Sequence, residues 1–285
     1  GDGLVDEEDN CDFVPNQYQA DLDGDEIGDA CDSDKDGDGY ASDVDCNDEA
    51  AGFYPGATEG FGTNCGISIP IAATKDAFAA IRADGSVLAW GNSESGGDPS
   101  TVLSQLDGTI PVVAVFSNLW SFAALRSDGS VVTWGKSQFG GDISAVAEGL
   151  DGSVAVIEIY NTDKAFAALR ADGSVVTWGN ASSGGDSESV SLEINGTKPV
   201  VKIFGSSGAF AALREDGSVI IWGDDVYGDS SWVSHELDGV IPVNAIFTGK
   251  DVFAAIKEDG TLVTWGNPDH GGDGSFTYSE LYNNY

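Results

Sequence analysis

The hydrophobic and polar residues of this chain repeat with a period of about 44 residues from Gly66 onward. Each period contains two runs in which apolar residues alternate, such as 165–170 and 174–179, joined by an Asp-Gly pair. Alternation is typical of strands, and Asp-Gly is typical of hairpin turns, because glycine adopts positive φ at no steric cost. A second Asp-Gly or Asn-Gly turn leads into a further strand such as 199–204. Each period therefore predicts four short antiparallel strands, which make one propeller blade.

A Trp-Gly pair marks the same position in every period, and we expect its tryptophan to belong to the blade core. The tryptophans are Trp90, Trp134, Trp178, Trp222 and Trp265, at spacings of 44, 44, 44 and 43 residues. The sequence therefore predicts an all-β fold, a five-bladed β-propeller with four-stranded antiparallel blades. The last period stops after 275–281, and the strand that it lacks is present at 69–74. We expect the terminal strands to pair and complete the fifth blade, or the strand to be donated to a neighbouring molecule in a filament.

Charge and cysteine content limit which binding partners and which cellular compartment the protein can have. The 285 residues include 48 acidic and 12 basic ones, a formal net charge of −36, which disfavours nucleic acid as a partner and favours divalent cations. The sequence has no apolar run of membrane-spanning length, no signal peptide and no methionine. We therefore expect no direct membrane insertion and a chain that begins inside a longer precursor. All four cysteines lie within the first 65 residues, which predicts local disulfides and a secreted protein.

The first 65 residues differ in composition from the rest, and we assign them to a separate domain, 1–65, ahead of a propeller domain at 66–285. The segment is too acidic to build a hydrophobic core, so metal ions and disulfides must stabilise it. Its aspartates fit the ligand spacing of EF-hand-like calcium loops, in which a backbone carbonyl takes the seventh position. The expected Ca²⁺ ligands are Asp21, Asp23, Asp25, the Ile27 carbonyl, Asp29 and Asp32, then Asp34, Asp36, Asp38, the Tyr40 carbonyl and Asp45, and Asp2, Asp6 and Asp9 of an upstream half-loop. Zinc is not expected, because both histidines lie far along the chain.

Two family resemblances rest on these motifs. The residues Asp9-Asn-Cys11, Val14-Pro-Asn16, Gln19, 21–25 and 28–32 resemble the thrombospondin type 3 repeat. That resemblance implies an irregular, calcium-wrapped chain with disulfides Cys11–Cys31 and Cys46–Cys65, and 36–59 looks like a related metal-binding motif of bacterial surface proteins. The repeated Phe-Ala-Ala-Leu-Arg-x-Asp-Gly-Ser-Val-Val-Thr-Trp-Gly resembles the regulator-of-chromosome-condensation repeat and its secreted bacterial relatives, which implies a propeller fold. In this chain Gly-Gly-Asp replaces the usual Gly-Gln-Leu-Gly, and the units are fewer and shorter than in that family.

Two sets of propeller residues are candidates for binding. One cation precedes the Asp-Gly turn in each repeat, namely Arg82, Arg126, Arg170, Arg214 and Lys257. These cations would form an anion-binding ring or, as we favour, pair with the turn carboxylates Asp84, Asp128, Asp172, Asp216 and Asp259. The second set breaks the repeat and suits either recognition of a partner or simple packing. It consists of Glu94, Phe139, Ser182, Tyr227, His270, Trp120 and Trp232.

No catalytic serine triad order, zinc motif or phosphate loop stands out, so we expect no enzymatic activity. The leading hypothesis is an extracellular, calcium-dependent adhesion, matrix or surface-filament structural protein. Its propeller would contact protein or glycan at a cell surface or in a matrix, with self-assembly in the filament version. The alternative is a secreted lectin or protein inhibitor that binds its ligand on the propeller face.

Overall fold

The computed structural model describes residues 9–11, 14–16, 18–35, 37, 71–228, 230 and 233–273. The chain divides into two compact units, Gly1–Ile69 and Pro70–Tyr285. No helix among the described residues has the length and apolar character needed to cross a membrane.

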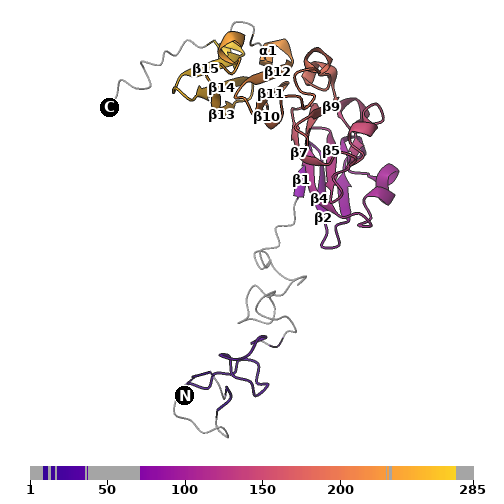
Figure 1. Cartoon of the computed structure of the whole chain (residues 1–285). Helices are drawn as coiled ribbons and strands as arrows, with labels where there is room; N and C mark the ends of the chain where they lie inside the picture. The colour runs from indigo at the N-terminus through magenta and orange to yellow at the C-terminus, as the bar shows by residue number, and fades with distance from the viewer. Residues whose placement is uncertain are drawn as a thin grey trace. The chain divides into compact units, whose positions relative to one another are not determined.

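The second unit is all-β and contains five three-stranded antiparallel sheets (Figure 1). Sheet 1 consists of β1 (Ile71–Ala73), β2 (Ala77–Ile81) and β3 (Val87–Gly91), and sheet 2 of β4 (Val112–Ser117), β5 (Ser121–Arg126) and β6 (Val131–Gly135). Sheet 3 consists of β7 (Val156–Asn161), β8 (Ala165–Arg170) and β9 (Val175–Gly179), and sheet 4 of β10 (Val200–Gly205), β11 (Ala209–Arg214) and β12 (Val219–Gly223). Sheet 5 consists of β13 (Val243–Thr248), β14 (Val252–Lys257) and β15 (Leu262–Gly266).

Short helical turns connect the strands. One turn of α-helix, α1 (Asp225–Gly228), follows sheet 4. The described 3₁₀ turns are η1 (Ser93–Ser95), η2 (Ser100–Gln105), η3 (Ser137–Phe139), η4 (Ala147–Gly149), η5 (Ala181–Ser183), η6 (Glu188–Val190), η7 (Ser234–Glu236) and η8 (Pro268–His270).

The prediction of four strands per blade is wrong, because the segment expected to form the fourth strand folds into 3₁₀ turns. The aspartate of the Gly-Gly-Asp loop accepts the backbone N–H two residues ahead, as Asp186 does at 2.9 Å from Glu188, the first residue of η6. Local bonds of this kind compete with a strand ladder. Among the described residues, sheets 1 to 4 each keep a hydrogen bond from the third strand to a buried Leu or Ile of this segment, for example Val131 N–H to the Leu150 carbonyl at 2.9 Å. Sheet 3 also has an isolated β-bridge between Ser174 and Asn195.

The expected role of the N-terminal strand in the fifth blade is also wrong. β1 pairs with β2 of its own sheet, with Ile71 opposite Ala80, and sheet 5 is formed by β13, β14 and β15 without it. The reason is local: β1 is joined to β2 by a short turn, as β4 is to β5, and a short connection favours antiparallel pairing of the two strands that it joins. The other strand proposed for closure, 275–281, lies outside the described residues.

The hydrophobic core consists of four layers, one between each pair of successive sheets. Residues that alternate along a strand point to opposite neighbours, so Phe122 packs towards sheet 1 and Ala123 towards sheet 3. A series of backbone hydrogen bonds also joins the turns of successive sheets. It runs from Lys75 N–H to Leu119, Leu119 to Asp163, Asp163 to Ser207, and Ser207 to the Lys250 carbonyl, at 2.7 to 3.2 Å. Sheets 1 and 5 stand at the two ends of this curved array (Figure 1).

The described part of the first unit is irregular and contains the disulfide Cys11–Cys31, which confirms the first pairing implied by the thrombospondin resemblance. The Cys11 side chain is buried. Gly28 lies close to the neighbouring Asn10, since a Cβ at Gly28 would be 2.3 Å from the Asn10 side-chain oxygen. The second implied pair, Cys46 and Cys65, lies outside the described residues.

Candidate functional sites

The Asp-rich loop brings three of the expected calcium ligands together. One carboxylate oxygen from each of Asp21, Asp23 and Asp25 lies within 4.8 Å of the others. Backbone hydrogen bonds shape the loop: Asp21 accepts from Gly24 N–H at 2.8 Å, and Asp25 accepts from Ile27 N–H at 2.8 Å. The backbone of Gly37 also approaches, because a Cβ there would lie 2.4 Å from Asp23 Oδ2.

The carboxylates of the loop affect one another through their charges. Desolvation raises the pKa of the Asp23 carboxyl above its ordinary value, the Asp25 backbone N–H opposes this rise, and the negative charges of Asp25, Asp32 and Asp21 add to it. The donor set consists of carboxylate oxygens, without nitrogen or sulfur, and these are the ligands that Ca²⁺ prefers. The cluster therefore fits a hard divalent cation, and bound Ca²⁺ would supply the positive charge that these side chains lack.

Other predicted ligands lie elsewhere in the loop or outside the described residues. Asp29 Oδ1 accepts the Leu22 N–H at 2.8 Å, and Asp32 Oδ1 accepts the Asp34 N–H at 2.9 Å, so these carboxylates also fold the backbone. Asp9 accepts the Cys11 N–H at 3.0 Å. The predicted ligands outside the described residues are Asp2, Asp6, Asp36, Asp38, Tyr40 and Asp45.

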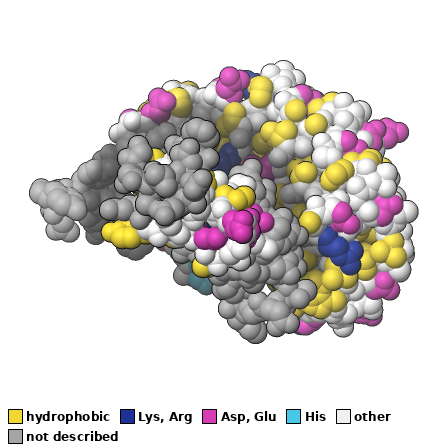
Figure 2. Space-filling view, turned by 90° about the horizontal axis from the view of Figure 1, so that it is seen from below, with side chains coloured by type: hydrophobic (Ala, Val, Ile, Leu, Met, Phe, Trp, Pro, Cys, Tyr) yellow, Lys and Arg dark blue, Asp and Glu magenta, His cyan; other side chains and the backbone are white. Residues whose placement is uncertain are grey.

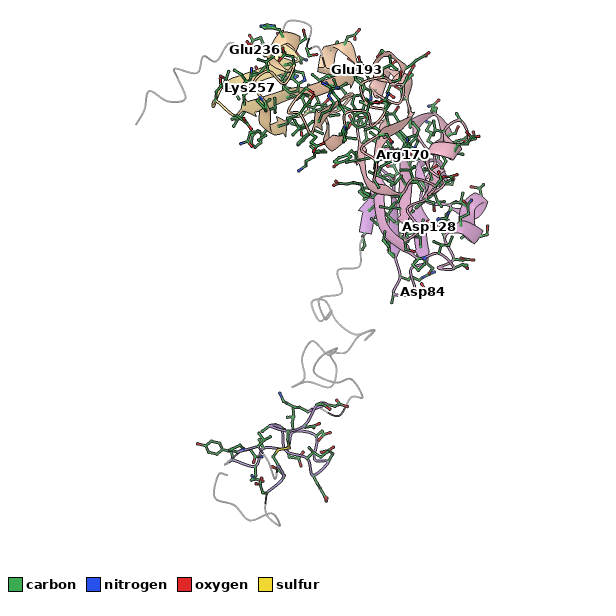
Figure 3. The ribbon with its side chains drawn as sticks, in the orientation of Figure 1. Asp84, Asp128, Arg170, Glu193, Glu236 and Lys257 are labelled. Carbon is green, nitrogen blue, oxygen red and sulfur yellow. A yellow bond between two sulfur atoms is a disulfide. The ribbon has the colours of Figure 1, made fainter. Side chains whose placement is uncertain are left out.

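The repeated cations of the second unit make the predicted ion pairs in part. Arg126 Nε lies 3.9 Å from Asp128 Oδ1 and Arg214 Nε lies 3.8 Å from Asp216 Oδ1, but the shorter bonds go to other partners. The arginines bond to the turn serine, as Arg170 Nε does to Ser174 Oγ at 2.8 Å. That serine in turn bonds to the turn aspartate, Asp172. Lys257 is buried and pairs with Glu236, at 2.8 Å, and not with the turn carboxylate Asp259 (Figure 3).

The hydrogen bonds of the repeated cations bear on whether these side chains form an anion-binding ring. The serine hydroxyl lies between cation and carboxylate, and it was not among the partners that the sequence predicted. Each described cation of this series bonds to a polar side chain, the four arginines within their own turn and Lys257 to Glu236 of the preceding repeat. The structural interpretation is therefore favoured over an anion-binding ring. The bonds are Arg82 to Ser86, Arg126 to Ser130, Arg170 to Ser174, Arg214 to Ser218 and Lys257 to Glu236.

A cluster of aromatic and cationic side chains lies where the loops of sheets 1 to 3 meet. The rings of Trp120 and Phe139 are 5.9 Å apart. Lys136 Nζ lies 4.8 Å from the centre of the Trp120 ring, Lys75 lies 5.3 Å from the same ring, and Lys164 lies 5.9 Å from the Phe139 ring. Three of twelve cations therefore gather in a strongly acidic chain. We call Trp120, Phe139, Lys75, Lys136 and Lys164 the aromatic–lysine cluster.

The backbone holds this cluster in place. The Phe139 carbonyl accepts hydrogen bonds from Asn118 Nδ2 at 2.6 Å and Ser121 Oγ at 2.7 Å, and Lys136 N–H donates to the Trp120 carbonyl at 3.1 Å. Sequence reasoning chose Trp120 and Phe139 as breaks in the repeat but missed the three lysines. The position of the lysines in the repeat could have indicated them. Lys75 and Lys164 lie in equivalent turns, and Lys136 follows a Trp-Gly pair.

The same loops of sheets 3, 4 and 5 enclose a hollow of about 330 Å³. Its lining includes Lys164, Tyr227 and Asp251. Tyr227 is half-buried against the core between sheets 4 and 5, so it contributes to packing as well. His270 Nδ1 lies 2.9 Å from Asp251 Oδ2.

The remaining residues that break the repeat are less informative. Glu94 and Ser182 are exposed, and Trp232 lies outside the described residues. On the face seen in Figure 2, hydrophobic side chains lie among Asp and Glu, with few Lys and Arg.

Comparison with known proteins gives no family for this chain. No family model matches, and no curated protein matches. Among solved structures, Prp20p from Saccharomyces cerevisiae is 17% identical with a TM-score of 0.45, over 69% of this chain and 56% of that chain. The CRINKLY WD40 ectodomain of the Arabidopsis thaliana receptor kinase ACR4 is 18% identical with a TM-score of 0.42, over 69% and 67%. The ectodomain of the Physcomitrella patens receptor kinase CR4 is 14% identical with a TM-score of 0.43, over 69% and 49%.

This chain thus spans about half to two thirds of the length of these solved chains. At these identities and TM-scores, the likeness decides nothing about activity or partners.

Proposed function

We propose that this chain is an extracellular, calcium-dependent structural or adhesion protein of a matrix, cell surface or surface filament, without enzymatic activity. The observation that supports it best is the disulfide-linked loop in which the carboxylates of Asp21, Asp23 and Asp25 converge. A disulfide persists in oxidising compartments. Acidic loops whose negative charges have few cationic side chains beside them become ordered where calcium is abundant. In this role the first unit is a calcium-stiffened spacer, and the sheets of the second unit make the contacts.

Calorimetric titration of the intact chain with Ca²⁺ tests the metal part of the proposal. Asp23→Asn removes a converging carboxylate, whereas Glu26→Gln removes the same charge from an exposed side chain of the same loop. We expect the first variant to lose most of the calcium uptake at this loop and the second to retain it. Equal affinity of the two variants, or no uptake by the parent chain at millimolar calcium, would contradict the proposal.

A second candidate function is a secreted lectin or protein inhibitor, and the aromatic–lysine cluster favours it. Aromatic faces beside ammonium groups suit acidic glycans or acidic protein surfaces. A glycan array and binding to acidic proteins would test it with Lys136→Gln, using Lys202→Gln as a control because it removes the same charge outside the cluster. Loss of binding only in the Lys136 variant would support this function.

A further inference from the structure

The two end sheets of the array expose side chains whose equivalents in the interior sheets are buried or half-buried. In sheet 1, Phe78 is 46% exposed and Trp90 is 43% exposed. Their equivalents in sheet 2, Phe122 and Trp134, are 0% and 2% exposed, because sheet 1 covers them. Leu88 follows the same rule, since it is 45% exposed.

The interior interfaces show what normally covers this face. Gly140, in the loop after the Trp-Gly pair of sheet 2, lies so close to sheet 3 that a Cβ there would be 2.7 Å from Phe166. The carbonyl of Gly140 accepts the hydrogen bond of Trp178 Nε1 at 3.1 Å. The same pair of contacts joins Gly96 to sheet 2, where the Trp134 bond is 2.8 Å long. The loop glycines of sheets 1 to 3 therefore seat the Phe and Trp of the next sheet, whereas the shorter loop after sheet 4 makes no such bond to Trp265.

Sheet 5 carries the matching half, and no further sheet follows it among the described residues, which end at 273. Gly271 occupies the same loop position with φ +98°, yet a Cβ there would meet nothing within 4 Å. Ile256, whose equivalents Leu125 and Leu169 are 7% and 2% exposed, is 37% exposed. The outer face of sheet 5 is thus the glycine-loop side of an interface, and the outer face of sheet 1 is its Phe–Trp side.

We propose that these two faces bind each other between molecules, so that sheet 5 of one copy packs on sheet 1 of a second copy, head to tail. Hydrophobic packing between successive sheets repeats four times within one chain, and three of these interfaces also have the glycine-loop contact. A second copy is the fitting occupant, because the first and fifth sheets stand at opposite ends of the array and do not cover each other (Figure 1). A pairing between different surfaces continues from copy to copy, which produces a filament or a large ring.

Charge sets the conditions for this assembly. Two copies of net charge −36 repel each other, and salt and divalent cations screen that repulsion. The proposal deepens the structural role proposed above and rests on it, but its interface residues lie outside the calcium loop. Calcium uptake is therefore measured on the same variants, so that lost assembly with intact calcium binding is distinguishable from failure of the calcium role.

The test is sedimentation of the intact chain over a wide concentration range at physiological salt with calcium. We expect the mass of the parent to rise with concentration. Leu88→Glu places a charge in the sheet 1 face and should weaken association roughly tenfold or more. Ile157→Glu adds the same charge at an exposed position of sheet 3 and should leave association unchanged.

Mixing two blocked variants tests the head-to-tail geometry. Leu88→Glu retains an intact sheet 5 face, and Ile256→Glu retains an intact sheet 1 face. Neither variant should self-associate, and an equal mixture should form heterodimers and nothing larger. A parent chain that stays monomeric at every concentration, whether its ends are free or closed on themselves, overturns the proposal. So does a mixture that fails to pair, or an Ile157→Glu variant that loses association as Leu88→Glu does.

Discussion

Substitution of Gly140 by alanine should destabilise the five-sheet array more than the same substitution at Gly271. Both glycines occupy the same loop position and have positive φ, at +105° and +98°. The backbone strain, about 1–2 kcal/mol for an L-residue in this region, is therefore common to both. Only at Gly140 does the new methyl group meet a neighbour, Phe166 at 2.7 Å, whose ring is fully buried.

The difference between the two variants isolates the steric cost of the sheet-to-sheet contact. Overpacking of a filled core costs about 1–3 kcal/mol. For a unit of this size, each kcal/mol lowers Tm by about 2–4 °C. Gly140→Ala should thus melt roughly 2–12 °C below Gly271→Ala.

Scanning calorimetry and urea unfolding followed by tryptophan fluorescence measure this difference, at low protein concentration to keep the ends of the array free. Equal Tm values for the two variants would refute the reasoning, because they would mean that the loop glycine does not seat the next sheet. A larger loss at Gly271 would refute it as well.

Three further outcomes are expected. Trp178→Phe should lower the free energy of unfolding in urea by about 1–3 kcal/mol more than Trp265→Phe does. The reason is that Trp178 Nε1 donates to a carbonyl, whereas buried Trp265 Nε1 has no partner among the described residues. Lys198 bonds to Asp216 and lowers the pKa of that carboxyl, so its contribution is present above the unfolded-state pKa and lost as pH falls through the native value. Asp216→Asn should flatten the acid limb of the pH–stability profile, by less than about 1 kcal/mol at this partly exposed site, and an unchanged limb would contradict it. Cys11 and Cys31 are separated by 20 residues, and replacing both with serine should lower the stability of the first unit by roughly 3 kcal/mol. The same change should weaken calcium uptake, measured by calorimetry. Unaltered uptake would count against a role of the disulfide in calcium binding.

The unpaired Trp265 has an identifiable origin in the sequence. The loop after Trp222 is one residue shorter than the others, which is why the last tryptophan spacing is 43 residues instead of 44. That loop folds as the α-helical turn Asp225–Gly228, whereas the longer loops form 3₁₀ turns. Only the tertiary structure shows that this deletion removes the carbonyl from the next sheet.

The sequence by itself determined the local structure. Alternating apolar residues and Asp-Gly turns specify hairpins such as β8–β9, since strand periodicity and positive φ depend on near neighbours. The Asp-x-Asp spacing likewise brought Asp21, Asp23 and Asp25 together, because a loop of this length can fold by its own backbone hydrogen bonds.

The tertiary structure decided what depends on competition and on distant partners. A fourth strand and a 3₁₀ turn are both compatible with 100–105, and hydrogen bonds to the loop aspartate favour the turn. Trp90 and Trp134 stand in the same repeated motif, yet one is exposed and the other buried, because only the second has a preceding sheet. The approach of Lys75 to Trp120 depends on how successive sheets stack, and no periodicity within one repeat encodes it.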